Sequence, residues 1–434
     1  MRSWQHREES VCRHAKRSPH VGGRVGDVLS VLLAWLADVK LAGTRGRDRA
    51  DEKKRGGGAA RGGPRTATLR AQIVSASEAF WNAASTHDKA RIQEMHVAAR
   101  NLNTVSRSNA AESFERYKQY FIDGRDLDPS SIRPIIKIVR PRTDEEKLFQ
   151  IARWTWSLPY STGYGRRLRF VVWDSFHGAL IGVIGLQSPP VDLSARDRLF
   201  SYPSSKKLDL INRTLDAYTI GAIPPYSNVL GGKLVAGLVA SSYVHQMYWV
   251  TYGGRKTQMA RKRIRDPLVA ITTTSAFGRS SIYNRLRYKD RTLAHPIGYT
   301  RGCGPLHLEA LYPQILQFLK KYEPELVLGG YGHGPKQRWQ LIKRALDRLG
   351  VPRRYFEHGV KRQVFLYPLV ADLNVGMAGG DFGPRLELDV EDYSAYWRER
   401  WAIPRSKRDG AWRGFRANPY FVRALYGPGE TDGI

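Results

Sequence analysis

Cysteine is nearly absent from this chain, since Cys12 and Cys303 are the only two in 434 residues. A disulfide framework and a zinc site built from cysteines are both excluded, because each needs more thiols than the chain has. The 11 histidines show no His-Glu-x-x-His spacing or similar ligand pattern, so the sequence predicts no metal site. This scarcity of thiols is typical of a protein in the reducing cytoplasm.

Long hydrophobic runs are also missing. The apolar run Val28 to Ala37 is too short to span a bilayer, and no small-x-small cleavage site follows it. The next segment, residues 43–64, is so rich in glycine and arginine that it cannot bury a core. We expect residues 1–70 to be a disordered basic tail and linker, or else spurious sequence from a start codon assigned too early. A cytoplasmic protein without a membrane partner is the prediction.

Acidic residues are scarce relative to basic ones, since 40 Asp and Glu stand against 70 Lys and Arg and leave a net charge of +30. Residues 1–70 hold 16 of the basic and 7 of the acidic residues, so +21 of the charge belongs to residues 71–434. A positive field of this size attracts polyanions such as DNA, RNA or nucleotides. Nucleic acid is therefore the expected partner. The alternative is a proteome with an arginine bias, in which surface Arg simply replaces Lys.

The stretch from Leu215 to Tyr288 has an informative order of elements. An apolar β-type run, Ala217 to Ile223, leads through a glycine turn into a helix predicted over Leu234 to Met247. A second β-type run, Leu268 to Thr274, follows a basic interruption. This order matches the cofactor half of an acyl-CoA N-acyltransferase fold.

The glycine turn is the candidate cofactor site. Glycines let the backbone approach a pyrophosphate, and the free N–H groups of the helix start face the anion. The candidate cofactor-binding residues are Asn228, Val229, Leu230, Gly231, Gly232 and Lys233. The alternative is an ordinary strand-to-helix turn, because a lone glycine pair is a weak motif.

The rest of the chain divides into segments of different composition. Residues 71–152 have helix formers at helical spacing and predict an N-terminal helical region. Two β-type runs, Leu168 to Asp174 and Ala179 to Leu186, flank a glycine-containing turn and predict a hairpin. Residues 153–302 are expected to form the core, and residues 303–434 an α-rich C-terminal extension. The predicted fold class is α+β, with a mixed central sheet of GNAT-like N-acyltransferase type.

Several motifs of the core follow one another in an order known from one family. They are Trp156-Ser157-Leu158-Pro159, GYGRRLRF at 163–170, LIGVIGL at 180–186, LSARDR at 193–198, Tyr283-Asn284 and Gly298-Tyr299-Thr300-Arg301-Gly302. On these residues, segment 153–302 resembles the DruA family, named for a component of the Druantia bacterial anti-phage system. The resemblance implies a defence or mobile-element context and a sheet related to acyltransferases, but no particular reaction. The chain departs from the family at Thr272-Thr273-Thr274-Ser275, where an acidic-aromatic strand ending is expected.

Tyr283 is the candidate catalytic residue. Working acyltransferases place a tyrosine here as the general acid for the leaving thiolate, a role that suits an O–H donor with a pKa of about 10. Their phosphate loop usually starts with Arg or Gln and ends with a small residue, whereas Asn228 and Lys233 occupy those places here. Lys233 could pair with a phosphate or obstruct its approach. Acyl-CoA is a possible cofactor, although no Asp or Glu of this stretch is an evident general base, and Tyr283 could also be a core aromatic.

Two segments concentrate positive charge. Residues 255–265 interrupt the core as a loop insertion would, and residues 336–349 predict a helix between Gly334-Pro335 and Gly350. The candidate nucleic-acid-binding residues are Arg255, Lys256, Arg261, Lys262, Arg263, Arg265, Arg344 and Arg348. The alternative is a solvated surface helix, which a cationic amphipathic helix most often is. No helix-turn-helix is predicted, because only one helix has convincing signals.

These observations favour a DruA-like protein that acts on or beside nucleic acid in bacterial anti-phage defence or in a mobile-element setting. One alternative is an active acyl-CoA-dependent N-acyltransferase that modifies a base, a nucleotide or an amine. A further alternative is a structural subunit that contacts other proteins of a defence complex.

Overall fold

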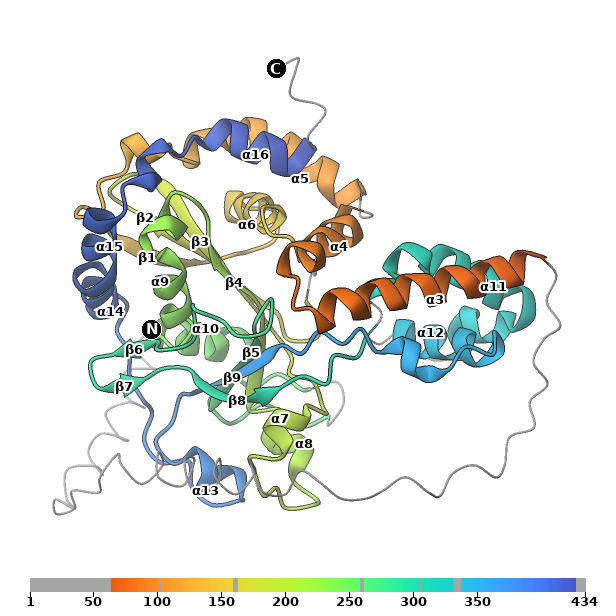
Figure 1. Cartoon of the computed structure of the whole chain (residues 1–434). Helices are drawn as coiled ribbons and strands as arrows, with labels where there is room; N and C mark the ends of the chain where they lie inside the picture. The colour runs from red at the N-terminus through yellow and green to blue at the C-terminus, as the bar shows by residue number, and fades with distance from the viewer. Residues whose placement is uncertain are drawn as a thin grey trace. The chain divides into compact units, whose positions relative to one another are not determined.

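The computed structural model of the protein describes residues 64–101, 104–158, 163–257, 261–304, 306–330 and 337–426 (Figure 1). Chain contacts divide the protein into residues 1–58 and 59–434, and all described residues belong to the second unit. The expected tail up to residue 63 lies outside the described residues, as do Pro159 and Lys336. Within the described ranges no helix is long and apolar enough to cross a membrane.

A seven-stranded sheet forms the centre of this unit. In spatial order its strands are β1 (Pro134–Ile138), β2 (Leu168–Asp174), β3 (Ala179–Gln187), β4 (Thr214–Ala222), β5 (Ala270–Thr274), β9 (Gln363–Pro368) and β8 (His295–Tyr299). Neighbouring strands are antiparallel except for β4 and β5, which are parallel. A separate ribbon pairs β6 (Arg287–Tyr288) with β7 (Arg291–Thr292). The predicted α+β class with a mixed sheet and a hairpin of β2 and β3 is confirmed.

Helices surround the sheet. They are α3 (Pro64–Ser85), α4 (Lys89–Asn101), α5 (Thr104–Tyr117), α6 (Asp144–Trp154), α7 (Ser194–Asp197), α8 (Lys207–Ile211), α9 (Gly231–Leu238), α10 (Ser242–Tyr252), α11 (Tyr312–Tyr322), α12 (Gln337–Arg348), α13 (Leu373–Met377), α14 (Val390–Trp397), α15 (Ile403–Arg408) and α16 (Ala417–Tyr426). The short helical turns are η1 (Lys118–Tyr120), η2 (Gly124–Asp126), η3 (Tyr226–Val229), η4 (Leu306–Leu311), η5 (Leu326–Gly330), η6 (Arg353–Phe356), η7 (Arg398–Ala402) and η8 (Ala411–Gly414).

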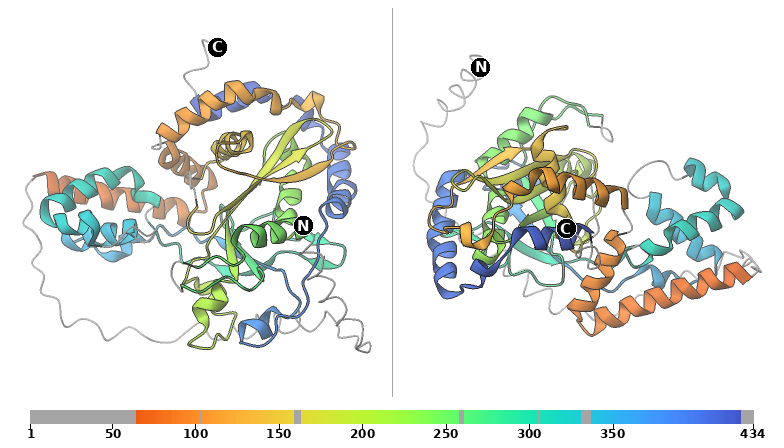
Figure 2. Two further views of the ribbon diagram at one scale, coloured as in Figure 1. Left: turned by 180° about the vertical axis from the view of Figure 1, so that it is seen from behind. Right: turned by 90° about the horizontal axis from the view of Figure 1, so that it is seen from above.

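Both faces of the sheet are covered, which is why all nine residues of β3 are buried. Helices α9, α10 and α14 cover one face, where they pack on Phe170 and Leu215. Helices α5, α6 and α16 cover the opposite face, where they pack on Val171 and Val183 (Figures 1 and 2). Adjacent residues such as Phe170 and Val171 belong to different cores because side chains alternate along a strand.

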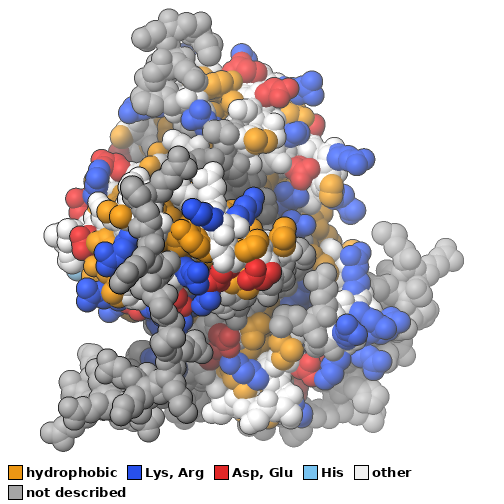
Figure 3. Space-filling model, turned by 90° about the vertical axis from the view of Figure 1, so that its right-hand side faces the viewer, with side chains coloured by type: hydrophobic (Ala, Val, Ile, Leu, Met, Phe, Trp, Pro, Cys, Tyr) orange, Lys and Arg blue, Asp and Glu red, His pale blue; other side chains and the backbone are white. Residues whose placement is uncertain are grey.

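Helices α3, α11 and α12, with η4 and η6, form a helical lobe beside the sheet (Figures 1 and 2). The lobe has a hydrophobic core of its own, in which Ile73 of α3 lies with Ile315 of α11 and Leu346 of α12. From the side of this lobe, cationic side chains are interspersed with hydrophobic and acidic ones (Figure 3). The lobe therefore does not present a purely basic face in this view.

Strand β4 is irregular at the point where the sheet opens. Its parallel pairing with β5 ends at Ala217↔Thr273, although β4 continues to Ala222. On the other side of β4, the register shifts at Tyr218, because Ala217 pairs with Leu186 and Thr219 with Gly185. Such a bulge bends a strand and increases its twist. Within the described residues, the last four residues of β4, 219–222, are not paired with β5.

Two predictions about elements need correction. The single helix predicted over Leu234 to Met247 is wrong, since α9 ends at Leu238 and α10 begins at Ser242. The Ser241 hydroxyl accepts a hydrogen bond from the Val244 N–H and so caps a new helix. The stretch from residue 303 onwards, expected to be an α-rich extension, also supplies β9 to the central sheet, where it lies between β5 and the edge strand β8.

Candidate cofactor and active site

The glycine turn joins β4 to α9 by way of η3. Leu230 has a left-handed backbone with φ of 64°, and α9 begins at the next residue, Gly231. A Cβ atom on Gly231 would lie 2.7 Å from the Tyr226 carbonyl oxygen, so only glycine fits there. Among the described residues, no acceptor is found for the N–H groups of Gly231 and Gly232. Unpaired N–H groups of this kind are usual in the first turn of a helix, and they can bind an anion.

Three side-chain hydrogen bonds hold this turn to the rest of the fold. The Tyr226 hydroxyl donates to the buried Asp174 carboxylate at 3.0 Å. From α14, Trp397 Nε1 donates to the Leu230 carbonyl at 3.0 Å, and the Tyr393 hydroxyl donates to the Lys233 carbonyl at 2.8 Å. Because each contact fixes a backbone or ring position, the turn has a defined shape without a ligand.

The Lys233 side chain is already engaged. Its ammonium donates to the carbonyls of Ser281, Ile282 and Asn284, each at 3.2 Å, and lies 5.4 Å from the Trp401 ring centroid. Burial lowers the pKa of Lys233, and the nearby charge of Arg285 lowers it further. Lys233 thus links the glycine turn to the 280–284 turn. Asn228 and Val229 belong to η3, where Val229 is buried.

A cavity of about 640 Å³ opens where β4 and β5 separate. It is lined by Ser227, Leu230, Gly232 and Lys233 of the turn, by residues 217–222 of β4, and by Thr273, Thr274, Ser281, Ile282 and Tyr283. The structure therefore brings the candidate turn and the candidate catalytic tyrosine to the same space. None of the described residues that line it is acidic.

Tyr283 lies in the wall of this cavity and is 6% exposed. Its ring packs on Phe365 with centroids 5.0 Å apart. Burial raises the pKa of Tyr283 to about 12, although a hydrogen bond with the Thr273 side chain opposes that rise. The hydroxyl therefore stays protonated at neutral pH.

Asp216 is a carboxylate that sequence reasoning missed. It accepts hydrogen bonds from Thr272 Oγ1 at 2.7 Å and from Gln187 Nε2 at 3.1 Å. Burial raises the pKa of Asp216, and its charge in turn raises the pKa of Tyr283. The feature of the sequence that could have pointed to Asp216 is its position as an acidic residue next to the apolar β-type run Ala217 to Ile223. Within the described residues, no group of three His, Cys, Asp or Glu side chains could hold a metal ion.

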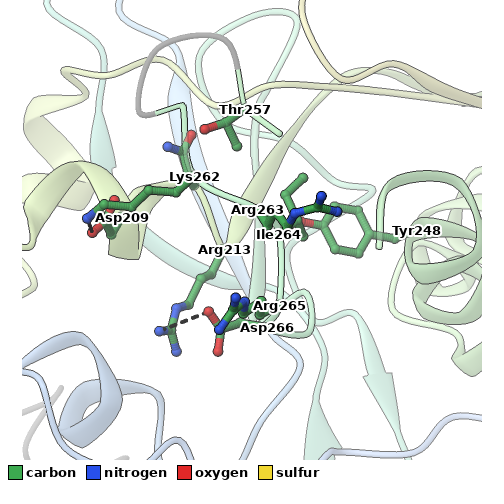
Figure 4. A pocket seen from close by; sticks show the side chains of 10 residues that line it. Asp209, Arg213, Tyr248, Thr257, Lys262, Arg263, Ile264, Arg265 and Asp266 are labelled. Atoms are coloured by element: carbon green, nitrogen blue, oxygen red, sulfur yellow. Dashed lines mark hydrogen bonds and ion pairs between the residues drawn. The ribbon is translucent and has the colours of Figure 1, made fainter. Parts of the chain in front are cut away.

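The predicted basic insertion is an antiparallel ribbon that follows α10. The Gly254 N–H donates to the Ile264 carbonyl and the Ile264 N–H to the Arg255 carbonyl, both at 2.8 Å. All six candidate cations are exposed: Arg255, Lys256, Arg261, Lys262, Arg263 and Arg265. The base of the ribbon borders a hollow of about 130 Å³, shown in Figure 4. There Lys262 Nζ lies 2.5 Å from Asp209 Oδ2.

Arg344 and Arg348 have a different environment from the ribbon. Arg344 Nε lies 2.6 Å from Glu323 Oε2, and Arg348 Nη1 lies 3.6 Å from Glu323 Oε1. The Glu323 side chain is only 8% exposed, so the two guanidinium groups neutralise a nearly buried carboxylate within the helical lobe.

Comparisons with known proteins extend the resemblance over more of the chain. Residues 86–379 match the family model described as "Druantia protein DruA". The chain is also 34% identical, over 310 residues, to a protein of that name from Escherichia coli (strain UMEA 4076-1). That alignment covers 70% of this chain and 76% of the relative. No solved structure matches the chain.

Proposed function

Because the chain belongs to the DruA family of Druantia components, we propose that it serves anti-phage defence through a GNAT-like N-acyltransferase core that uses acyl-CoA. The observation that carries this proposal is the cavity that joins the first turn of α9 to Tyr283 between β4 and β5. The element order supports it, because strand, glycine turn, helix and parallel strand follow one another as in the cofactor half of that fold.

The residues around the cavity fit such a ligand. The N–H group of Gly232, which lines the cavity, would hold the pyrophosphate at the positive end of the α9 dipole, with the N–H group of Gly231 directly before it. Residues 219–222 of β4, which are not paired with β5, offer backbone donors and acceptors to the amides of a pantetheine arm. Acyl-CoA supplies an activated acyl group as a thioester. Tyr283 holds a proton in the cavity wall for a leaving thiolate.

Isothermal titration of the full chain with acetyl-CoA tests this proposal. S-acetylpantetheine is the comparison ligand, because it keeps the thioester and the pantetheine arm and lacks the pyrophosphate together with the 3′-phosphoadenosine. We expect acetyl-CoA to bind at least about tenfold more tightly, which corresponds to about 1.4 kcal/mol, because its phosphates gain contacts with the start of α9. An absence of heat at millimolar acetyl-CoA would reduce the turn to a strand-to-helix connection and Tyr283 to a core aromatic.

A second candidate function, contact with nucleic acid, is favoured by the ribbon of residues 255–265. Six cations are exposed on it. Within the described residues, one of them forms an ion pair, namely Lys262 with Asp209. Exposed cations at this density can neutralise several phosphates and release their counterions. Sequence preference should be slight, because phosphate contacts do not read bases.

Fluorescence anisotropy with labelled single-stranded and duplex DNA at increasing salt tests this second function. Replacing Arg261, Lys262, Arg263 and Arg265 by Gln should weaken binding and reduce the slope of log affinity against log salt by up to about 3–4. The control variant removes four exposed cations elsewhere: Lys320, Lys321, Lys407 and Arg408. If both variants bound DNA as the unmodified chain does, the ribbon would be an ordinary solvated surface and the structural-subunit alternative would gain.

A further inference from the structure

The cavity between β4 and β5 continues to the face of the sheet that is opposite α9. There it reaches α4, the end of α6, and α16. The residues that line this second chamber are Gln93, Arg153, Trp156, Tyr218, Phe277 and Tyr420. The acyl group and an acceptor could therefore enter from opposite faces and meet at the gap between the two strands.

Aromatic rings dominate the walls of the chamber. The Trp156 indole fills the space of a side chain at position 221, since a Cβ on Gly221 would lie 2.5 Å from its ring. Phe277 stacks on His96, with ring centroids 5.1 Å apart and an interplanar angle of 23°. Each ring is thus held from behind by the protein. Rings fixed in this way favour a flat ligand, because stacking on them costs little side-chain entropy.

The charged side chains around the cavity limit which chemical groups can bind as the acyl acceptor. Arg153 and Lys233 are the charged side chains among the described residues that line the whole cavity. Arg153 is 2% exposed and donates to Thr219 Oγ1 at 3.1 Å. An ammonium group would lose its hydration here without gaining a carboxylate, which is costly. Polyamines and lysine side chains are therefore disfavoured, whereas a neutral nitrogen is compatible with the walls.

We propose that this chamber receives an unstacked nucleobase, and that the neutral exocyclic amine of the base is the acyl acceptor. The proposal rests on the acyltransferase function proposed above. It combines aromatic rings in the walls, the absence of carboxylates among the described lining residues, and a net charge of +30 that attracts polyanions. Stacking on aromatic side chains is worth about 1–3 kcal/mol per base, which offsets the cost of extruding it.

The transfer step is balanced without any further reactant. The exocyclic nitrogen forms a bond to the thioester carbonyl carbon, and the carbon–sulfur bond breaks. The departing sulfur takes the proton of the Tyr283 hydroxyl. The proton lost by the nitrogen restores that hydroxyl, so the products are an amide on the base and a free thiol.

Binding of a fluorescent base, measured without acyl-CoA, tests the chamber. The probes are a single-stranded oligonucleotide with one 2-aminopurine, the free 2-aminopurine nucleoside, and an oligonucleotide with an abasic site as competitor. We expect the full chain to quench 2-aminopurine, and the abasic competitor to displace the probe at least about tenfold less well than the intact strand. Quenching of the free nucleoside as well would identify nucleotides as ligands, and quenching in the strand alone would identify polynucleotides.

Variants locate the binding. Phe277→Leu and Trp156→Leu should each lower the affinity for the probe, as measured by quenching, about tenfold. This is the change expected from the loss of one stacking contact. Phe176→Leu is the matched control, because Phe176 is 54% exposed and does not line the cavity.

The proposal would be overturned if both chamber variants, Phe277→Leu and Trp156→Leu, quenched the probe as the unmodified chain does. The variants must have unfolding temperatures like that of the unmodified chain for this result to count. Tighter binding of spermidine than of the nucleoside would also overturn the proposal. Acetyl-CoA binding without any quenching would refute the chamber alone. Quenching without acetyl-CoA binding would instead leave the base site standing and refute the acyltransferase.

Discussion

Replacing Gly232 by aspartate tests the phosphate loop while the fold is preserved. A Cβ on Gly232 would lie 3.4 Å from Ile282 Cδ1, which is an ordinary contact, and the backbone there is not left-handed. A carboxylate in the first turn of α9 stabilises the helix by about 0.3–1 kcal/mol through its interaction with the helix dipole. Aspartate is also a somewhat better helix former than glycine. The free energy of unfolding should therefore stay the same or rise slightly.

Binding should respond in the opposite direction. A carboxylate 4–8 Å from a phosphate repels it by about 2–4 kcal/mol at the effective dielectric constant near a protein surface. The affinity for acetyl-CoA should consequently fall by roughly 30- to 800-fold. Because salt screens this repulsion, the loss should shrink as ionic strength rises.

Titration calorimetry of the folded variant measures this change, with urea denaturation as the check on stability. Gly414→Asp is the control, since Gly414 is exposed and a Cβ there meets no atom within 4 Å. If Gly232→Asp bound acetyl-CoA as tightly as the unmodified chain, the first turn of α9 would not hold the pyrophosphate, and the reasoning would fail.

The remaining predictions concern stability. Tyr226→Phe removes one hydrogen bond to Asp174 and should cost about 1.5–3 kcal/mol in urea denaturation, whereas the exposed Tyr299→Phe should stay within about 0.5 kcal/mol. Burial, and after it the charge of Arg362, lowers the pKa of His96 to about 4. The unfolded chain therefore takes up a proton at this residue below pH 6.5 while the folded chain does not, and stability falls as pH falls towards 4. His96→Phe should remove that loss, which is about 2 kcal/mol at pH 5, and an unchanged pH dependence would contradict it.

Local signals predicted much of the core. Helix α6 (Asp144–Trp154) begins with Asp144, Glu145 and Glu146 and has no proline, and most of it lies in the region 71–152 that was predicted to be helical. The hairpin of β2 and β3 and the order of β4, turn and α9 follow from short-range patterns that the chain does not override. Such features depend on neighbours in the sequence, so a single sequence is enough to find them.

Contacts between distant segments could not be predicted in this way. The pairing of β9 with β5 joins residues almost a hundred positions apart. In the sequence Lys233 looks like a phosphate ligand, whereas in the fold its ammonium donates to three carbonyls of the 280–284 turn. Arg344 resembled a free surface cation because nothing in the sequence pairs it with Glu323. Charge and spacing show which groups are available, and the tertiary fold determines which of them are already bound.

The anchoring of the glycine turn by α14 has a consequence for how the protein can be divided. Tyr393 and Trp397 hold the Lys233 and Leu230 carbonyls, yet both residues follow the end of the family match at residue 379. The Tyr393 ring also fills the space beside Gly237, where a Cβ would lie 2.0 Å from it. A fragment cut at the end of the match would lack these supports, so the smallest portion suited to ligand-binding work extends through Trp397. Any partner that pulled α14 away would loosen the turn without touching the cavity.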